Sequence, residues 1–101
     1  MAPDAATLQA LSAIVAAKPY ARRHYWLARK VGRFIDADLL IACGNADLAQ
    51  TDQWRADLEA DLRSANWQLH DLVIAFGREL PTGKQEDWLR IIPFGRDDQG
   101  G

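Results

Sequence analysis

The sequence has one cysteine, two histidines and two serines, and these shortages exclude several common kinds of site. Cys43 alone cannot form an internal disulfide framework or a zinc site of several thiolates, and we interpret it as a small buried hydrophobe. Both serines lie in segments of helical pattern, so no Ser-His-Asp arrangement is expected. Neither His24 nor His70 has a second ligand at metal-site spacing, and we interpret both as structural. The lone cysteine fits a reducing compartment, which predicts a cytoplasmic protein.

Long apolar runs and a large net charge are also missing. No run approaches the roughly 20 apolar residues of a membrane-spanning helix, and the start of the chain lacks the pattern of a secretory signal, so we expect no membrane association. The net charge is −2, which predicts no general affinity for nucleic acid. The charges are uneven, because residues 18–33 hold six of the 12 basic residues and no acid. A nucleic-acid partner therefore stays open as the weaker alternative.

The composition is that of an ordinary globular protein, with 101 residues, 49% of them hydrophobic and 26% charged. This length supports a single domain, which we place at residues 1–95, with a flexible polar tail at 96–101. Apolar residues at helical spacing predict one amphipathic helix behind Asp4, ending at Lys18 and Pro19. They predict a second helix over about 52–64, with Thr51 as its N-cap.

Apolar runs at 39–43 and 67–76, each followed by a glycine, predict two strands, and a helix stays open as the alternative for 67–76. Residues 20–34 fit a helix or a strand, and residues 86–92 predict one further short element. The fold class expected is α/β, a small mixed domain with amphipathic helices packed on a short sheet. The chain has 17 alanines and only 12 β-branched residues, a balance that favours helix. An all-α bundle of five to six short helices is therefore the alternative.

Three carboxylates lie beside the two predicted strands. Asp36 and Asp38 precede the first strand, and Asp71 lies in the second. If the strands pair, the three could meet at one end of the sheet and hold a divalent cation through oxygen ligands. Carboxylates around Mg²⁺ serve phosphoryl and nucleotidyl transfer by neutralising phosphate charge.

The run from Asp36 to Ile41, a following helix and the run from His70 to Ile74 resemble the small stand-alone (minimal) nucleotidyltransferases. The resemblance covers residues 8–76 and implies that Asp36, Asp38 and Asp71 bind Mg²⁺. In that family a Gly-Ser pair on a turn ahead of the Asp-x-Asp motif holds the nucleotide. Here residues 27–32 contain no serine, so we expect no catalytic residue.

The segment rich in bases and aromatics supplies further candidates. Cations mixed with aromatic rings are typical of phosphate and single-stranded nucleic-acid contacts, and tryptophan is frequent at the centre of protein interfaces. The candidate phosphate or nucleic-acid contacts are Arg29, Lys30, Arg22 and Arg23. The candidate interface residues are Trp26, Tyr25 and Trp88.

These observations predict a small non-catalytic interaction or accessory protein, on a degenerate nucleotidyltransferase-like fold. Its expected partner is another protein or a second copy of the chain, and no cofactor is expected. The alternative is a Mg²⁺-dependent nucleotidyltransferase that uses Asp36, Asp38 and Asp71.

Overall fold

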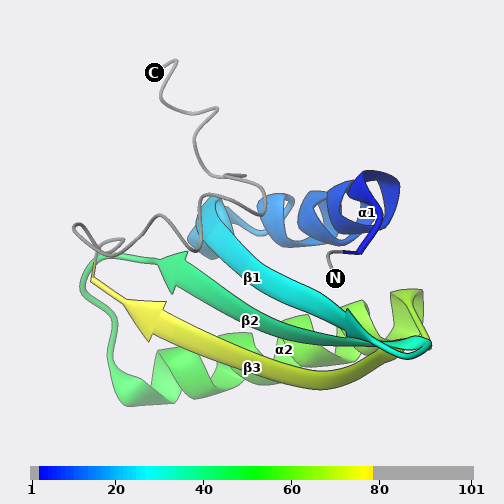
Figure 1. The fold of residues 1–101 in the computed structure, drawn as a ribbon. Coiled ribbons are helices and arrows are strands. Elements are labelled where there is room, and N and C mark those ends of the chain that lie inside the picture. The colour runs from blue at the N-terminus through cyan, green and yellow to red at the C-terminus, as the bar shows by residue number, and fades with distance from the viewer. Residues whose placement is uncertain (1–2, 79–101) are drawn as a thin grey trace.

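The fold comes from a computed structural model that describes residues 3–78 (Figure 1). The elements in chain order are helix α1 (Ala5–Ala16), the short 3₁₀ helix η1 (Pro19–Ala21), strands β1 (Arg23–Val31) and β2 (Phe34–Ala42), helix α2 (Leu48–Ala65) and strand β3 (Leu69–Gly77). The expected α/β class is confirmed, and the all-α alternative is wrong. The short element expected at 86–92 and the tail at 96–101 lie outside the described residues.

The three strands form one mixed sheet with β2 in the centre. β1 pairs with β2 in antiparallel register, from Arg23 opposite Ala42 to Val31 opposite Phe34. β3 pairs with the other edge of β2 in parallel register. A parallel neighbour needs a crossover connection, and α2 supplies it.

The ambiguous segment at 20–34 is resolved as a hairpin. Gly32 and Arg33 are the two loop residues, and Gly32 has a φ of 65° while Arg33 does not have a positive φ. A positive φ at the first loop residue only is the pattern of a type II′ turn, which suits the twist of paired strands. The turn therefore begins β2 at Phe34 rather than at residue 39 as predicted. Asp36 and Asp38 consequently lie within the strand and do not cap it.

Both helices cover the same face of the sheet (Figure 1). Side chains along β1 and β2 alternate between this covered face and an open face, as the period of a strand requires. Trp26, Leu39 and Ile41 are fully buried beneath the helices. Leu11 and Val15 of α1, with Leu58 and Leu62 of α2, complete the same core.

Helix α2 begins four residues before the start predicted for it. Asp47 is the N-cap: its carboxylate accepts a hydrogen bond from the Gln50 amide at 2.8 Å, and the Gln50 side chain accepts one from the Asp47 amide at 3.3 Å. This reciprocal capping box satisfies two amides that would otherwise lack partners. Thr51, the predicted N-cap, is buried inside the first turn, where its hydroxyl donates to the Leu48 carbonyl at 3.2 Å.

A polar and aromatic network joins the segment after α1 to α2. The ring of Tyr20 stacks on Trp54 at 4.5 Å, and its hydroxyl donates to Asp57 at 2.7 Å. Lys18 pairs with Asp57 at 2.9 Å and with Asp61 at 2.8 Å. These hydrogen bonds raise the pKa of Lys18, whereas burial first and then the bond to Asp57 raise the pKa of Tyr20. The network fixes the path of the chain from α1 into β1.

Neither helix within residues 3–78 is both long enough and apolar enough to cross a membrane.

Candidate metal centre

The open face of the sheet holds the carboxylates that the sequence singles out. Asp36 lies in the register of Asp71 on β3, and on the other side it lies opposite Arg29 on β1. Asp38, two residues along β2, points to the same face because strand side chains repeat with period two. The three aspartates therefore share one face, as the sequence predicted they could. Their binding of a metal stays a prediction.

A β-bulge at the start of β3 adds a fourth side chain. Leu69 pairs with Ile35 and Asp71 pairs with Asp36, so one extra residue, His70, lies opposite a single step of β2. A bulge of this kind turns two consecutive side chains away from the alternation of the strand. Both His70 and Asp71 are exposed, while Leu69 before them is buried. The bulge thus sends His70 and Asp71 toward Asp36.

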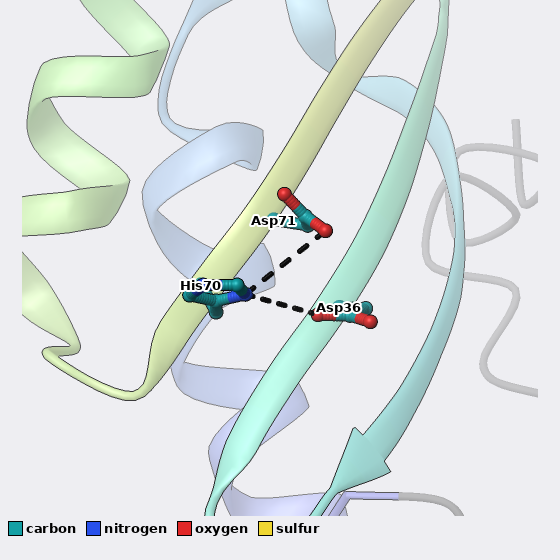
Figure 2. Close-up of side chains that lie close together, drawn as sticks. All are labelled: Asp36, His70 and Asp71. Atoms are coloured by element: carbon teal, nitrogen blue, oxygen red, sulfur yellow. Dashed lines mark ion pairs between the residues drawn. The ribbon is translucent and has the colours of Figure 1, made fainter.

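The three side chains point toward one another in Figure 2. The His70 Nδ1 atom lies 3.7 Å from Asp36 Oδ1 and 4.0 Å from Asp71 Oδ2. One donor atom from each residue lies within 4.8 Å of the other two. In a tetrahedral site with metal–ligand distances of about 2.1 Å, ligand atoms are about 3.4 Å apart. Small rotations of exposed side chains would bring these atoms to that spacing.

Burial differs among the three donors. The side chains of His70 and Asp71 are 63% and 72% exposed, whereas that of Asp36 is 27% exposed. Asp36 Oδ1 is shielded from solvent and has no hydrogen-bond partner among the described residues. A shielded carboxylate oxygen is costly to leave unpaired, and a cation beside it would offset that cost. This oxygen is the one that faces His70.

The chemistry of the donor set favours some metals over others. One imidazole with two carboxylates suits Zn²⁺ and other late first-row ions, since imidazole is a preferred ligand for these ions. Mg²⁺ prefers oxygen ligands in octahedral geometry. The arrangement can therefore hold a metal on the surface of the sheet. Asp38 is not part of the cluster of Asp36, His70 and Asp71. It does line, with Asp36 and Asp71, a hollow of about 560 Å³ on the open face.

Aromatic residues lie next to the cluster. The ring of Phe34 lies 5.3 Å from the imidazole of His70, and Trp67 meets Phe34 edge-on at 6.3 Å. Val31, opposite Phe34 across the hairpin, is 48% exposed and Trp67 is 69% exposed. We call Val31, Phe34 and Trp67 the aromatic patch. It places exposed apolar surface directly beside the candidate metal ligands.

The structure separates the basic residues proposed as phosphate contacts. Arg29 and Lys30 lie at the hairpin end of β1, and Arg29 lines the hollow on the open face. Arg23 begins the same strand and Arg22 precedes it, six or more residues and therefore about 20 Å away. The four residues do not form one cluster. Their contact with phosphate stays a prediction.

The proposed interface residues have different surroundings. Trp26 is 0% exposed and faces the helices, so its assignment to an interface is wrong. The alternation of β1 sends it inward, where an aromatic ring fills the space beneath α1. Tyr25 points to the open face and is half-buried. Trp88 lies outside the described residues.

His24 and Cys43 were both interpreted from the sequence as structural residues, and the structure shows how far each is buried. His24 is fully buried, and its Nδ1 lies 2.8 Å from the Ala21 carbonyl oxygen, so Nδ1 donates and Nε2 accepts from the Ser12 hydroxyl. It is a structural histidine, as expected. Cys43 is half-buried beside the core, and desolvation raises the pKa of its thiol. This favours the unreactive thiol over the nucleophilic thiolate.

Sequence reasoning missed His70 as a candidate ligand. The spacing rules for metal sites look for histidines repeated along a helix or a loop, and His70 stands alone. The available signal was its position next to Asp71 at the start of a strand whose partner carries Asp36. That position indicates a shared site only if a bulge turns His70 and Asp71 to the same face, and the sequence does not show the bulge.

No protein-family model matches this sequence, and no curated protein matches it. Among solved structures, the chain is similar to MamM CTD. A cadmium form of a MamM CTD variant has a TM-score of 0.67 at 17% identity, covering 75% of this chain and 98% of that one. A zinc form gives 0.66 at 18%, with 74% and 85% covered, and a nickel form gives 0.65 at 19%, with 71% and 94% covered. At these identities the likeness shows the fold alone. The resemblance to minimal nucleotidyltransferases is not tested by it and stays a prediction.

Proposed function

We propose that this protein is a small non-catalytic interaction domain that binds a late first-row divalent metal such as Zn²⁺ through Asp36, His70 and Asp71. The observation that carries the proposal is the bulge, which turns His70 and Asp71 toward a shielded Asp36 oxygen that has no hydrogen-bond partner among the described residues. The fold likeness supports it, because the similar MamM CTD structures include zinc, cadmium and nickel forms.

The interaction part of the proposal rests on the aromatic patch. Phe34 touches both His70 and Trp67, so a metal that fixes the imidazole also restricts the ring beside it. Exposed aromatic side chains at one end of a small domain are typical of protein contacts. The partner is a protein or a second copy of this chain, in a reducing, cytoplasmic compartment.

The test is isothermal titration of the metal-free protein with Zn²⁺. We expect one site, and we expect at least a tenfold weaker affinity in His70→Ala, in Asp36→Asn and in Asp71→Asn, because each removes one of three ligands. Asp38→Asn is the matched control, since it changes an aspartate on the same face that lies outside the cluster. Its affinity for Zn²⁺ should equal that of the wild type.

The same variants separate this proposal from the nucleotidyltransferase alternative. If the protein were a nucleotidyltransferase, titration with Mg²⁺ and ATP would give a heat of binding, and Asp38→Asn would abolish it. Zn²⁺ binding that is unchanged in His70→Ala would contradict the proposed metal site. Light scattering of the same samples with and without Zn²⁺ reports whether the metal changes the mass of the assembly.

A further inference from the structure

The open face of the sheet is too apolar, over more than half its length, to be an ordinary solvent face. Beyond Asp36 and Asp38, the open-face positions of β2 are Leu40 and Ala42, and β3 adds Val73 and Ala75. A mixed sheet covered by helices on one face normally shows polar side chains on the other. Val73 is 58% exposed. This surface has the character of a covered face that the described residues leave uncovered.

The charges on this face are as distinctive as its apolar part. Asp36, Asp38 and Asp71 gather at the hairpin end, and Arg29 is the basic residue in register beside them. The face therefore combines an apolar half, toward the end of β3, with an acidic half, toward the start of β3. A segment that fits it needs apolar side chains and positive charge.

Residues 88–96 of this chain have that composition. The segment reads Trp-Leu-Arg-Ile-Ile-Pro-Phe-Gly-Arg, with five large apolar residues, two arginines and no acid. Elsewhere between residue 34 and the C-terminus acids outnumber bases, so this stretch is an exception in the acidic part of the chain. Its charge is complementary to the aspartates of the open face.

The lengths also agree. β3 ends at Gly77 at the apolar end of the face, and residues 78–87 separate it from the segment. Those residues include Pro81, Thr82 and Gly83, which favour a reversal of direction. Ten residues span about 33 Å when extended. Residues 88–96 and β3 are both nine residues long, so the segment can follow the face from its apolar end to its acidic end.

We propose that residues 88–96 bind back onto the open face of the sheet, with their apolar side chains on Leu40 and Val73 and their arginines toward the aspartates. The segment then covers the apolar half of the face and reaches the edge of the candidate metal centre. This goes beyond the proposed function and does not depend on it, since the contacts are formed by the chain without metal. A second copy of the chain is the competing occupant.

Disulfide trapping in the full-length chain with Cys43→Ser tests the placement. Val73→Cys is paired with Leu89→Cys or with Ile91→Cys, two positions that sample the register. The matched control pairs the same tail positions with Ala60→Cys, an exposed alanine on α2 in the other layer. Because a disulfide forms only when two Cα atoms lie within about 7 Å, we expect at least one Val73→Cys pair to close within the monomer and neither Ala60→Cys pair to do so.

Methyl NMR of the metal-free protein with its native cysteine gives a second readout that needs no cross-link. Ring currents from Trp88 should shift the methyl signals of Leu40 and Val73, and Trp88→Ala should remove those shifts. Trp67→Ala is the control, because Trp67 lies beside Phe34 at the other end of β2. Equal closure with Ala60→Cys, or unmoved methyl signals in Trp88→Ala, overturns the proposal. Closure only as cross-linked dimers also overturns it and assigns the face to a second copy.

Discussion

The central strand makes the most quantitative prediction, because Leu39 lies at the middle of the core. Leu39 is 0% exposed, and its register partners on the two neighbouring strands are Trp26 and Ile74, both buried. Leu39→Ala would leave a cavity bordered by a rigid indole ring and a β-branched side chain, which have little freedom to close it. Poor relaxation places the cost toward the upper part of the range for buried leucines, at about 3–4 kcal/mol.

That cost is large compared with the total stability expected of the domain. A chain of 101 residues has a free energy of unfolding of about 5–15 kcal/mol at typical values per residue. A loss of 3–4 kcal/mol raises the unfolded fraction by a factor of roughly 160–870. With a urea m-value of about 1.5 kcal/mol per molar, the unfolding midpoint should fall by about 2–2.7 M.

Urea unfolding followed by far-ultraviolet circular dichroism measures this directly. The measurement is made with a chelator present, because metal bound to the folded state would add its own stabilisation. Leu48→Ala is the matched control: the same atoms are removed from a side chain that is 81% exposed, so its cost should stay within about 0.5 kcal/mol. A midpoint for Leu39→Ala within about 0.5 M of wild type, or an equal loss in Leu48→Ala, would refute the described core.

Two further predictions concern caps and pH. Asp47→Ala removes the capping box of α2 and should cost about 1 kcal/mol in the same urea assay, whereas Asp47→Asn should keep most of it; equal loss in both would contradict the cap. The pKa of Asp57 is lowered by its hydrogen bonds from Lys18 first and Tyr20 second. Ionised Asp57 therefore stabilises the folded state above its ordinary pKa of 3.8, and this stabilisation is lost as the pH falls through the lower folded-state pKa. Asp57→Asn should flatten the acid side of the stability profile, by a small amount because the carboxylate is 45% exposed, and an unchanged acid side would contradict this role.

Much of the fold could be predicted because periodicity and glycines carried the information. The glycines at 44 and 77 end β2 and β3 within two residues of the predicted ends. The start of β2 was missed because its first residues alternate between faces, so Asp36 and Asp38 interrupt the apolar run that identifies a buried strand. The hairpin was missed because Gly-Arg is a weaker turn signal than Asn-Gly or Asp-Gly.

The candidate site was only half predictable, and the reason is a single inserted residue in β3. Strict alternation after Leu69 would leave Asp71 on the covered face with Leu69, and His70 alone on the open face. The bulge shifts the phase by one, so His70 and Asp71 both point outward, and Ile74, which strict alternation would place outward, points inward. Asp36 and Asp38 lie two residues apart, so a regular strand places both on one face without any irregularity. The sequence therefore pointed to Asp38 as a ligand. The histidine that changes the expected metal from Mg²⁺ to Zn²⁺ depends on an irregularity that hydrophobic pattern does not reveal. A local departure from the period of a strand thus marks the place where these side chains meet.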